Sequence, residues 1–248
     1  MIEQFSEPAY RYHDGKLSPA VLPGDISRNS LLGLDREQTL IKRNIERFLA
    51  GKPALNVLLW GEKGAGKSTI VRMLASEYAR RNLRVIEYCD NDFYGIYELY
   101  HIIRKHSTYR FVIYFDDVSF DDSDERYRKF KSIVEGGLEE KPANSLFIAT
   151  SNRRHFIAEK AMDTQDIYNR DIINEQSSLH ARFGLTLGFY PLERTLYLEI
   201  VGYYMEKNGI PHFDGWEETA EAYAMQRGGR SGRAAQQFCI YYQITEGE

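Results

Sequence analysis

The sequence has few cysteines and no long apolar run. Only two of its 248 residues are cysteines, Cys89 and Cys239, and no spacing pairs them. We therefore expect two reduced, buried thiols rather than a disulfide-stabilised secreted fold. No apolar stretch approaches the roughly 20 residues that span a bilayer, and residues 1–16 lack the apolar core of a signal peptide. These absences predict a cytoplasmic protein without a membrane partner.

An excess of positive charge is also missing. Lys and Arg number 32 against 36 Asp and Glu, which gives a net charge of -4. A dedicated, sequence-independent DNA coat would be strongly basic, so this class is disfavoured, although a local basic patch remains compatible. No Cys stands near His101 and His106, and no G-x-S-x-G pattern occurs, so neither zinc binding nor serine hydrolysis is indicated. Hydrophobic residues at 43% and aromatics at 13% instead fit an ordered globular protein.

Short apolar runs alternate with amphipathic helical patterns through most of the chain. The runs predict strands over residues 54–60, 83–89, 110–117, 145–151 and 185–190. Apolar residues at helical spacing predict helices over 35–50, 67–81, 93–106 and 123–135. This alternation predicts an α/β fold in which helices cover both faces of a five-stranded parallel sheet.

The composition changes near residue 190. After Pro191 the strand signals end, and three helical segments follow to the C-terminus. At the other end, residues 1–30 carry several prolines and glycines and show little periodicity. We expect an N-terminal surface arm over residues 1–30, an α/β core over 31–190 and a small helical domain over 191–248.

A phosphate-binding motif begins where the first predicted strand ends. Residues 61–68 read GEKGAGKS, which is the complete pattern G-x-x-x-x-G-K-[ST], placed between a strand and a helix. The glycines let successive backbone N–H groups face phosphate oxygens, and the helix N-terminus adds partial positive charge. We expect Lys67 to reach the β- and γ-phosphates and Ser68 to ligate Mg²⁺. The expected ATP-binding residues here are Gly61, Glu62, Lys63, Gly64, Ala65, Gly66, Lys67, Ser68 and Thr69.

Polar side chains end two later strands. Asp116 and Asp117 close the strand over 110–117, and Asn152 follows the next strand. In phosphate-loop proteins such a strand delivers an Asp to Mg²⁺, so we assign Asp116 to the metal. Asp117, shorter by one methylene than the Glu that many ATPases use, would orient the attacking water, and Asn152 would hold that water from the other side. Arg153 and Arg154 follow directly and fit a solvated turn or a phosphate or nucleic-acid contact.

Two arginines are candidates for stabilising transferred phosphate. Arg182 precedes the last predicted strand, and Arg233 lies in the glycine-rich run that opens the last helix. An arginine near the γ-phosphate stabilises the charge of the transition state, from the same chain or from a neighbour. Each of them taken alone is typical of a surface residue, and they gain weight only as members of a pattern.

Together these motifs resemble the AAA+ ATPases, and in particular the bacterial family of uncharacterised AAA+ proteins known as DUF815. The resemblance spans roughly residues 10–245. It rests on six segments in order: LLGLDR from residue 31, VLLWGEKGAGKS, FDDVSF, ATSNRRH, ARFGL and GGRSGRAAQQF.

The resemblance implies a core with a helical lid, ATP and Mg²⁺ bound between them, and a ring. Lys67 and Ser68 then correspond to the Walker A pair, Asp116 and Asp117 to Walker B, and Asn152 to sensor 1.

Further roles follow from the same resemblance. Arg182 corresponds to the arginine finger that acts on a neighbour's nucleotide, and Arg233 to sensor 2, with Arg230 as the competing choice. Leu31 to Leu34, including Leu32 and Gly33, would line the adenine pocket. The family usually has Asp immediately before the finger arginine, whereas this chain has Ala181.

The leading hypothesis is a Mg·ATP-hydrolysing AAA+ protein that forms a homo-oligomeric ring, with a hexamer as one candidate size, and remodels or loads an unknown protein client. One alternative is a slow or inactive nucleotide-dependent switch, which Asp117 and Ala181 favour. Another is a DNA-linked loader similar to replication-initiator and helicase-loader ATPases. Arg153 and Arg154 support that alternative, and the acidic charge balance counts against it.

Overall fold

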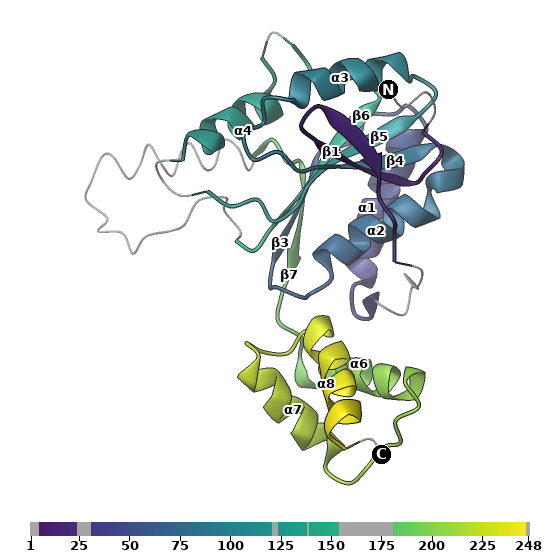
Figure 1. Ribbon diagram of the computed structural model, residues 1–248, viewed down its shortest axis with the longest axis vertical. Coiled ribbons are helices and arrows are strands. Elements are labelled where there is room, and N and C mark those ends of the chain that lie inside the picture. Colours follow the sequence, from purple (N-terminus) through teal and green to yellow (C-terminus); the bar gives the residue numbers. More distant parts are fainter. Residues whose placement is uncertain (1–4, 24–30, 121–123, 138, 154–180, 247–248) are drawn as a thin grey trace, which may run out of the picture.

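A computed structural model describes residues 5–23, 31–120, 124–137, 139–153 and 181–246 (Figure 1). Its described strands form one seven-stranded sheet in the order β2-β1-β4-β5-β6-β3-β7. The strands are β1 (Ala9–His13), β2 (Lys16–Pro19), β3 (Val57–Gly61), β4 (Leu83–Tyr88), β5 (Arg110–Phe115), β6 (Ser145–Ser151) and β7 (Leu185–Phe189). Neighbouring strands are parallel except β1 and β2. The α/β class with a mostly parallel sheet is confirmed.

The expected number of five strands is wrong because the N-terminal segment adds two more. Strand β1 lies parallel to β4, and β2 returns antiparallel beside it. Asp14 and Gly15 both have positive φ and form the two-residue turn between them. Tyr10 and Tyr12 are buried while Arg11 is exposed, which is the alternation of a strand with one covered face. The other strands were predicted as short apolar runs, and neither AYRYH nor KLSP is such a run.

Helices cover both faces of the sheet (Figure 1). Helices α1 (Asp35–Leu49) and α2 (Lys67–Glu77), followed by the short 3-10 helix η2 (Ala79–Arg81), lie on one face; α3 (Ile96–Lys105) and α4 (Glu125–Glu135) lie on the other. The strands divide their side chains between two cores: Val57 and Leu59 pack with α1 and α2, and Leu58 packs with α3. The central strands β3, β5 and β6 are almost entirely buried because helices cover both faces of the sheet.

The last three helices share a core of their own. Helices α6 (Arg194–Lys207), α7 (Trp216–Gln226) and α8 (Gly232–Thr245), here called the C-terminal helices, bury Tyr197, Val201, Ala235 and Phe238 against one another. Figure 1 shows them gathered beyond the ends of β3 and β7, apart from the helices that cover the sheet.

The two cysteines differ in environment. Both are free, and Cys239 is buried as expected, where burial raises its pKa to about 11. The expectation that Cys89 is buried is wrong: its residue is exposed, because it lies just beyond the last residue of β4. No helix in the described ranges is both long enough and apolar enough to cross a bilayer.

Candidate functional site

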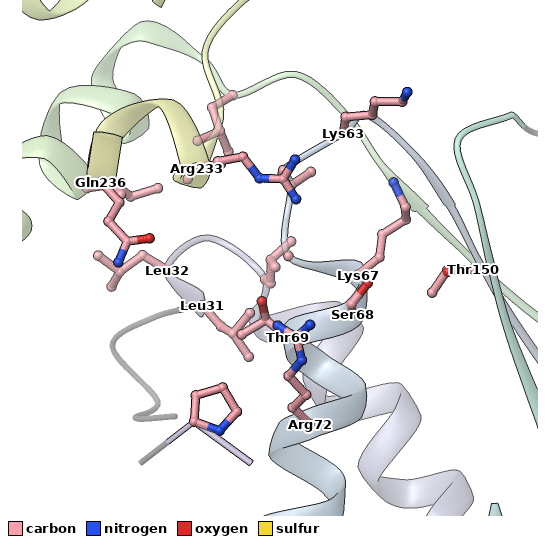
Figure 2. Close-up of a pocket in the computed structure, with 18 of the residues that line it drawn as sticks. Leu31, Leu32, Lys63, Lys67, Ser68, Thr69, Arg72, Thr150, Arg233 and Gln236 are labelled. Carbon is pink, nitrogen blue, oxygen red and sulfur yellow. The ribbon is translucent and has the colours of Figure 1, made fainter. Parts of the chain in front are cut away.

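The loop between β3 and α2 opens onto a cavity of about 870 Å³. The carboxyl ends of β5 and β6 form one side of the cavity, and the C-terminal helices form another, as part of Figure 2 shows. Its lining consists of Pro23, Leu31, Leu32, Leu34, Lys63, Gly64, Ala65, Gly66, Lys67, Ser68, Thr69, Arg72, Asp116, Asp117, Thr150, Asn152, Leu192, Ile200, Tyr204, Lys207, Gly232, Arg233 and Gln236.

Backbone geometry explains the first glycine of the loop. Gly61 has φ +125°, and a Cβ placed there would lie 1.9 Å from the Phe189 carbonyl oxygen. The next N–H, of Glu62, donates to that same oxygen at 2.9 Å. Only glycine lets the chain leave β3 this close to β7. Helix α2 then begins at Lys67, and the N–H groups of its first turn lack intrahelical acceptors.

Lys67 is held inside the loop. Its residue is 8% exposed, and its ammonium donates to the carbonyl oxygens of Gly61 at 2.6 Å and Glu62 at 2.8 Å. A third hydrogen bond, of 3.1 Å, reaches Oδ1 of Asn152. Burial lowers the pKa of Lys67, and the nearby carboxylate of Asp117 opposes that effect. The ammonium is thus a cation whose hydrogen-bond acceptors are neutral. It lies at the cavity wall, where an anion could accept its hydrogen bonds instead.

Asp116 accepts hydrogen bonds from three hydroxyl groups. Ser68 Oγ donates to its Oδ1 at 3.1 Å, Thr150 Oγ1 at 2.6 Å, and the Tyr114 hydroxyl at 2.5 Å. Burial, and then the charge of Asp116, raise the pKa of Tyr114, so this hydroxyl stays a donor. The network fixes the Asp116 carboxylate beside the Ser68 hydroxyl, and both are the hard oxygen ligands that Mg²⁺ prefers.

Asp117 and Asn152 form a second connected pair. Asp117 has φ +51°, a conformation that costs a non-glycine residue energy and is frequent at functional sites. Its N–H donates to Thr150 Oγ1 at 2.8 Å, which holds that conformation. The amide nitrogen of Asn152 donates to the Asp117 carboxylate while its oxygen accepts from Lys67. Asn152 therefore joins the phosphate loop to the acidic strand end.

The structure separates the candidate arginines. Arg233 lines the cavity, and Figure 2 shows it extending from the start of α8 over the loop that precedes α2. The backbone N–H of Arg233 donates to the Gly64 carbonyl oxygen at 3.3 Å. Arg230 is outside the lining and instead donates to Glu221. Arg182 is exposed and also outside the lining of its own chain's cavity.

Several other predicted residues do not face the cavity. Gly61 and Glu62 contribute carbonyl oxygens to Lys67 rather than lining surface. Gly33 also lies outside the lining, since its turn packs against Leu196, which would be 2.3 Å from an added Cβ. The N–H of Arg153 donates to Ser151 Oγ at 3.2 Å. Arg154 and part of the N-terminal arm lie outside the described residues.

Sequence reasoning missed one wall of the cavity. Ile200, Tyr204 and Lys207 line it from a single face of α6, at spacings of four and three residues. Gln236 lies three residues after Arg233 on α8, and Arg72 lies four after Ser68 on α2. Helical spacing relates these side chains to one another, and that was the available signal, but nothing in the sequence indicates which face of α6 meets the core.

Comparisons with known proteins agree with this architecture. The family described as "Protein of unknown function (DUF815)" matches residues 5–246. Among curated proteins, none matches the chain. The solved structure of the Holliday junction branch migration motor RuvB from Thermotoga maritima aligns with a TM-score of 0.57 and 17% identity over 89% of this chain and 65% of that one.

A variant of the same RuvB protein aligns with a TM-score of 0.56 and 16% identity over 85% of this chain and 62% of the other. This chain therefore spans less than two thirds of the length of these structures. At such identity the likeness shows only that this chain shares the fold of the RuvB structures.

Proposed function

The chain belongs to the DUF815 family, and from that premise we propose that it binds Mg·ATP in the cavity and hydrolyses it. One observation carries the proposal. Continuous hydrogen bonding joins the phosphate loop, through Lys67 and Asn152, to Asp117, which lies just beyond the end of β5. A solvated turn beside unrelated acids would not need this connection.

The phosphates fit the loop and the start of α2. The backbone N–H groups of the first helical turn offer donors and partial positive charge. Lys67 adds a cation whose partners are neutral carbonyl and amide oxygens. Together these groups match a polyphosphate in both charge and hydrogen-bond polarity.

Mg²⁺ fits the oxygen pair formed by Ser68 and Asp116, which are joined at 3.1 Å. The ion would neutralise phosphate charge when bound. Tyr114 and Thr150 hold the Asp116 carboxylate in place, so these two residues act as positioning groups for the metal ligand.

The remaining chemistry belongs to Asp117, Asn152 and Arg233. Asp117 accepts a proton from the attacking water, and Asn152 keeps its carboxylate oriented. Arg233 has no carboxylate partner among the described residues, and it lines the cavity beside the phosphate loop. Its cation stabilises the charge that develops on the transferred group.

Adenine, the purine base of ATP, fits the apolar part of the cavity. Leu31, Leu32 and Leu34 offer apolar surface there, and Ile200 and Tyr204 of α6 line the same cavity. An apolar slot of this kind suits the faces of a purine ring. We therefore assign adenine to the space between residues 31–34 and the C-terminal helices.

A neighbouring subunit would complete the site. Arg182 is exposed and is not among the residues that line its own chain's cavity, which suits an arginine that acts on a second chain. On this basis we extend the proposal to a homo-oligomeric ring that acts on an unknown protein client. Ala181, in place of the family's usual Asp, leaves Arg182 without an adjacent acidic partner.

The test is ATP turnover with Mg²⁺, measured against the protein's own concentration. We expect activity per subunit to rise with concentration and to vanish in Lys67→Ala or when EDTA removes the metal. Lys52→Ala, which changes an exposed lysine outside the cavity lining, is the matched control. Undiminished turnover in Lys67→Ala would overturn the assignment. ATP binding without turnover at every concentration would select the switch over the ATPase.

A further inference from the structure

Glu221, on α7, accepts hydrogen bonds from two arginines: Arg194 at the start of α6, and Arg230 shortly before α8 begins. Glu221 Oε2 accepts from Arg194 Nε at 2.7 Å. Its Oε1 accepts from Arg230 Nε at 3.1 Å and from Arg230 Nη2 at 2.6 Å. Both oxygens are therefore engaged, and the two arginines lower the pKa of the Glu221 carboxyl group.

Arg230 stands at one end of a short link to the nucleotide site. Its carbonyl oxygen accepts from Leu192 N at 3.2 Å, and the next residue, Ser231, caps α8 by accepting from Ala234 N at 3.1 Å. Two residues after Ser231, the N–H of Arg233 donates to Gly64. The side chain of Arg233 thus leaves the backbone only three positions after the arginine that Glu221 holds.

The residues before Arg230 are held by a backbone hydrogen bond, from Gly229 N to the Ala224 carbonyl oxygen at 2.9 Å, and not by side-chain packing. Gly228 and Gly229 precede Arg230 with φ of +89° and +116°, and an added Cβ at either would meet nothing within 4 Å. Paired glycines in open space supply conformational freedom rather than support. The segment is therefore held by the backbone hydrogen bonds of Gly229 and Arg230 and by the contact of Arg233 with Gly64, and Glu221 supplies the side-chain contact to Arg230.

We propose that Glu221 is a positioning residue for Arg233: by clamping Arg230 to Arg194, it holds the start of α8 where Arg233 reaches the terminal phosphate of bound ATP. This inference rests on the proposed function, because it takes ATP to bind in the cavity and Arg233 to contact its terminal phosphate. Arg230 acts as part of the clamp rather than as a phosphate ligand.

Exposure distinguishes this role from simple stabilisation. The side chain of Glu221 is 21% exposed, that of Arg230 27% and that of Arg194 49%. Ion pairs this close to solvent contribute little to the free energy of folding. We therefore expect loss of the clamp to change where Arg233 lies much more than whether the helices fold.

The experiment compares the affinity for a non-hydrolysable ATP analogue with the affinity for ADP. For Glu221→Gln and Glu221→Ala we expect analogue affinity to fall roughly three- to tenfold, as the partial loss of one charged hydrogen bond, with ADP affinity unchanged. Glu217→Gln is the matched control, because Glu217 is on the same helix and, within the described part of the chain, accepts from Arg194 alone, at 3.1 Å. It should leave both affinities unchanged.

A double-mutant cycle supplies the decisive arm. If Glu221 acts through Arg233, then Glu221→Ala should have no further effect in an Arg233→Ala background. Additive effects, an equal loss of analogue and ADP affinity, or a wild-type affinity ratio in Glu221→Ala would each overturn the inference. Failure of the wild-type protein to bind either nucleotide would instead overturn the proposed function, and this inference with it. Circular dichroism checks that each variant is folded.

Discussion

The two sides of the cavity are built differently. On the core side, short polar side chains stand directly at strand ends, and each is fixed by neighbours close to the sheet, as Asp116 is by Thr150. On the side of the C-terminal helices, long side chains such as Arg233 and Lys207 reach in from separate helices. Their helices pack on a core of their own, and near Arg233 an ion-pair network joins Glu221 to Arg194 and Arg230 while the Arg233 backbone N–H donates to Gly64. The core side thus suits chemistry that needs fixed geometry, and the helical side suits sensing.

The largest expected effect lies on the core side, at Asp117. Asp117→Asn keeps the shape of the side chain but removes the base, so kcat for ATP hydrolysis should fall by roughly 10²- to 10⁴-fold. Affinity for ATP should change only a few-fold, because Asp117 is assigned to the water and not to the phosphates. Steady-state kinetics with a separate binding assay measures both quantities. A variant that keeps full kcat would remove Asp117 from the mechanism.

The next effect concerns the metal. Asp116→Ala should raise the Mg²⁺ concentration that gives half-maximal turnover by about 10- to 100-fold, the usual cost of disturbing a metal ligand or its support. Glu62→Ala, which removes an exposed acid in the phosphate loop but outside the lining, is the matched control. An equal Mg²⁺ requirement in the two variants would contradict the assignment of Asp116.

On the helical side the effect should be smaller and selective. Arg233→Ala should lower the affinity for ATP roughly tenfold, the cost of a charge-assisted hydrogen bond, and leave that for ADP unchanged. Arg227→Ala, an exposed arginine at the end of α7 whose guanidinium lies over the Tyr223 ring, should change neither. Isothermal titration calorimetry with both nucleotides checks this. Equal losses for ATP and ADP would place Arg233 away from the terminal phosphate.

The smallest expected effect is at the residues assigned to adenine. Leu32→Ala removes apolar surface from the assigned adenine slot and should weaken ATP and ADP equally, by about three- to tenfold for partly buried methyl groups. Because the loss is uniform binding energy, KM should rise while kcat stays constant. A change confined to ATP would mean that the base lies elsewhere in the cavity.

The sequence predicts the core side of the cavity better than the side formed by the C-terminal helices. The phosphate loop and the strand ends are local patterns, so Lys67, Asp116 and Asn152 could be brought together by the rule that parallel strands end at one edge. The N-terminal strands were missed because neither AYRYH nor KLSP is an apolar run of the kind that predicted the other strands.

The helical side could not be predicted in the same way. Only the family resemblance favoured Arg233 over Arg230, because no local pattern shows that Arg233 lines the cavity while Arg230 binds Glu221 of α7. Likewise, which face of α6 meets the cavity depends on packing between helices distant in sequence, as in the core that contains Tyr197 and Phe238. Such contacts are set by tertiary structure rather than by any local spacing.

The most direct test of the central claim is calorimetric titration of the wild-type protein and Lys67→Ala with ATP in the presence of Mg²⁺, with Lys52→Ala as the control. The account predicts one ATP per chain for the wild type and the control, and an affinity lower by roughly 10- to 150-fold in Lys67→Ala, the cost of losing hydrogen bonds from a charged group. Equal ATP affinity in all three proteins, or no binding by the wild type, would contradict it.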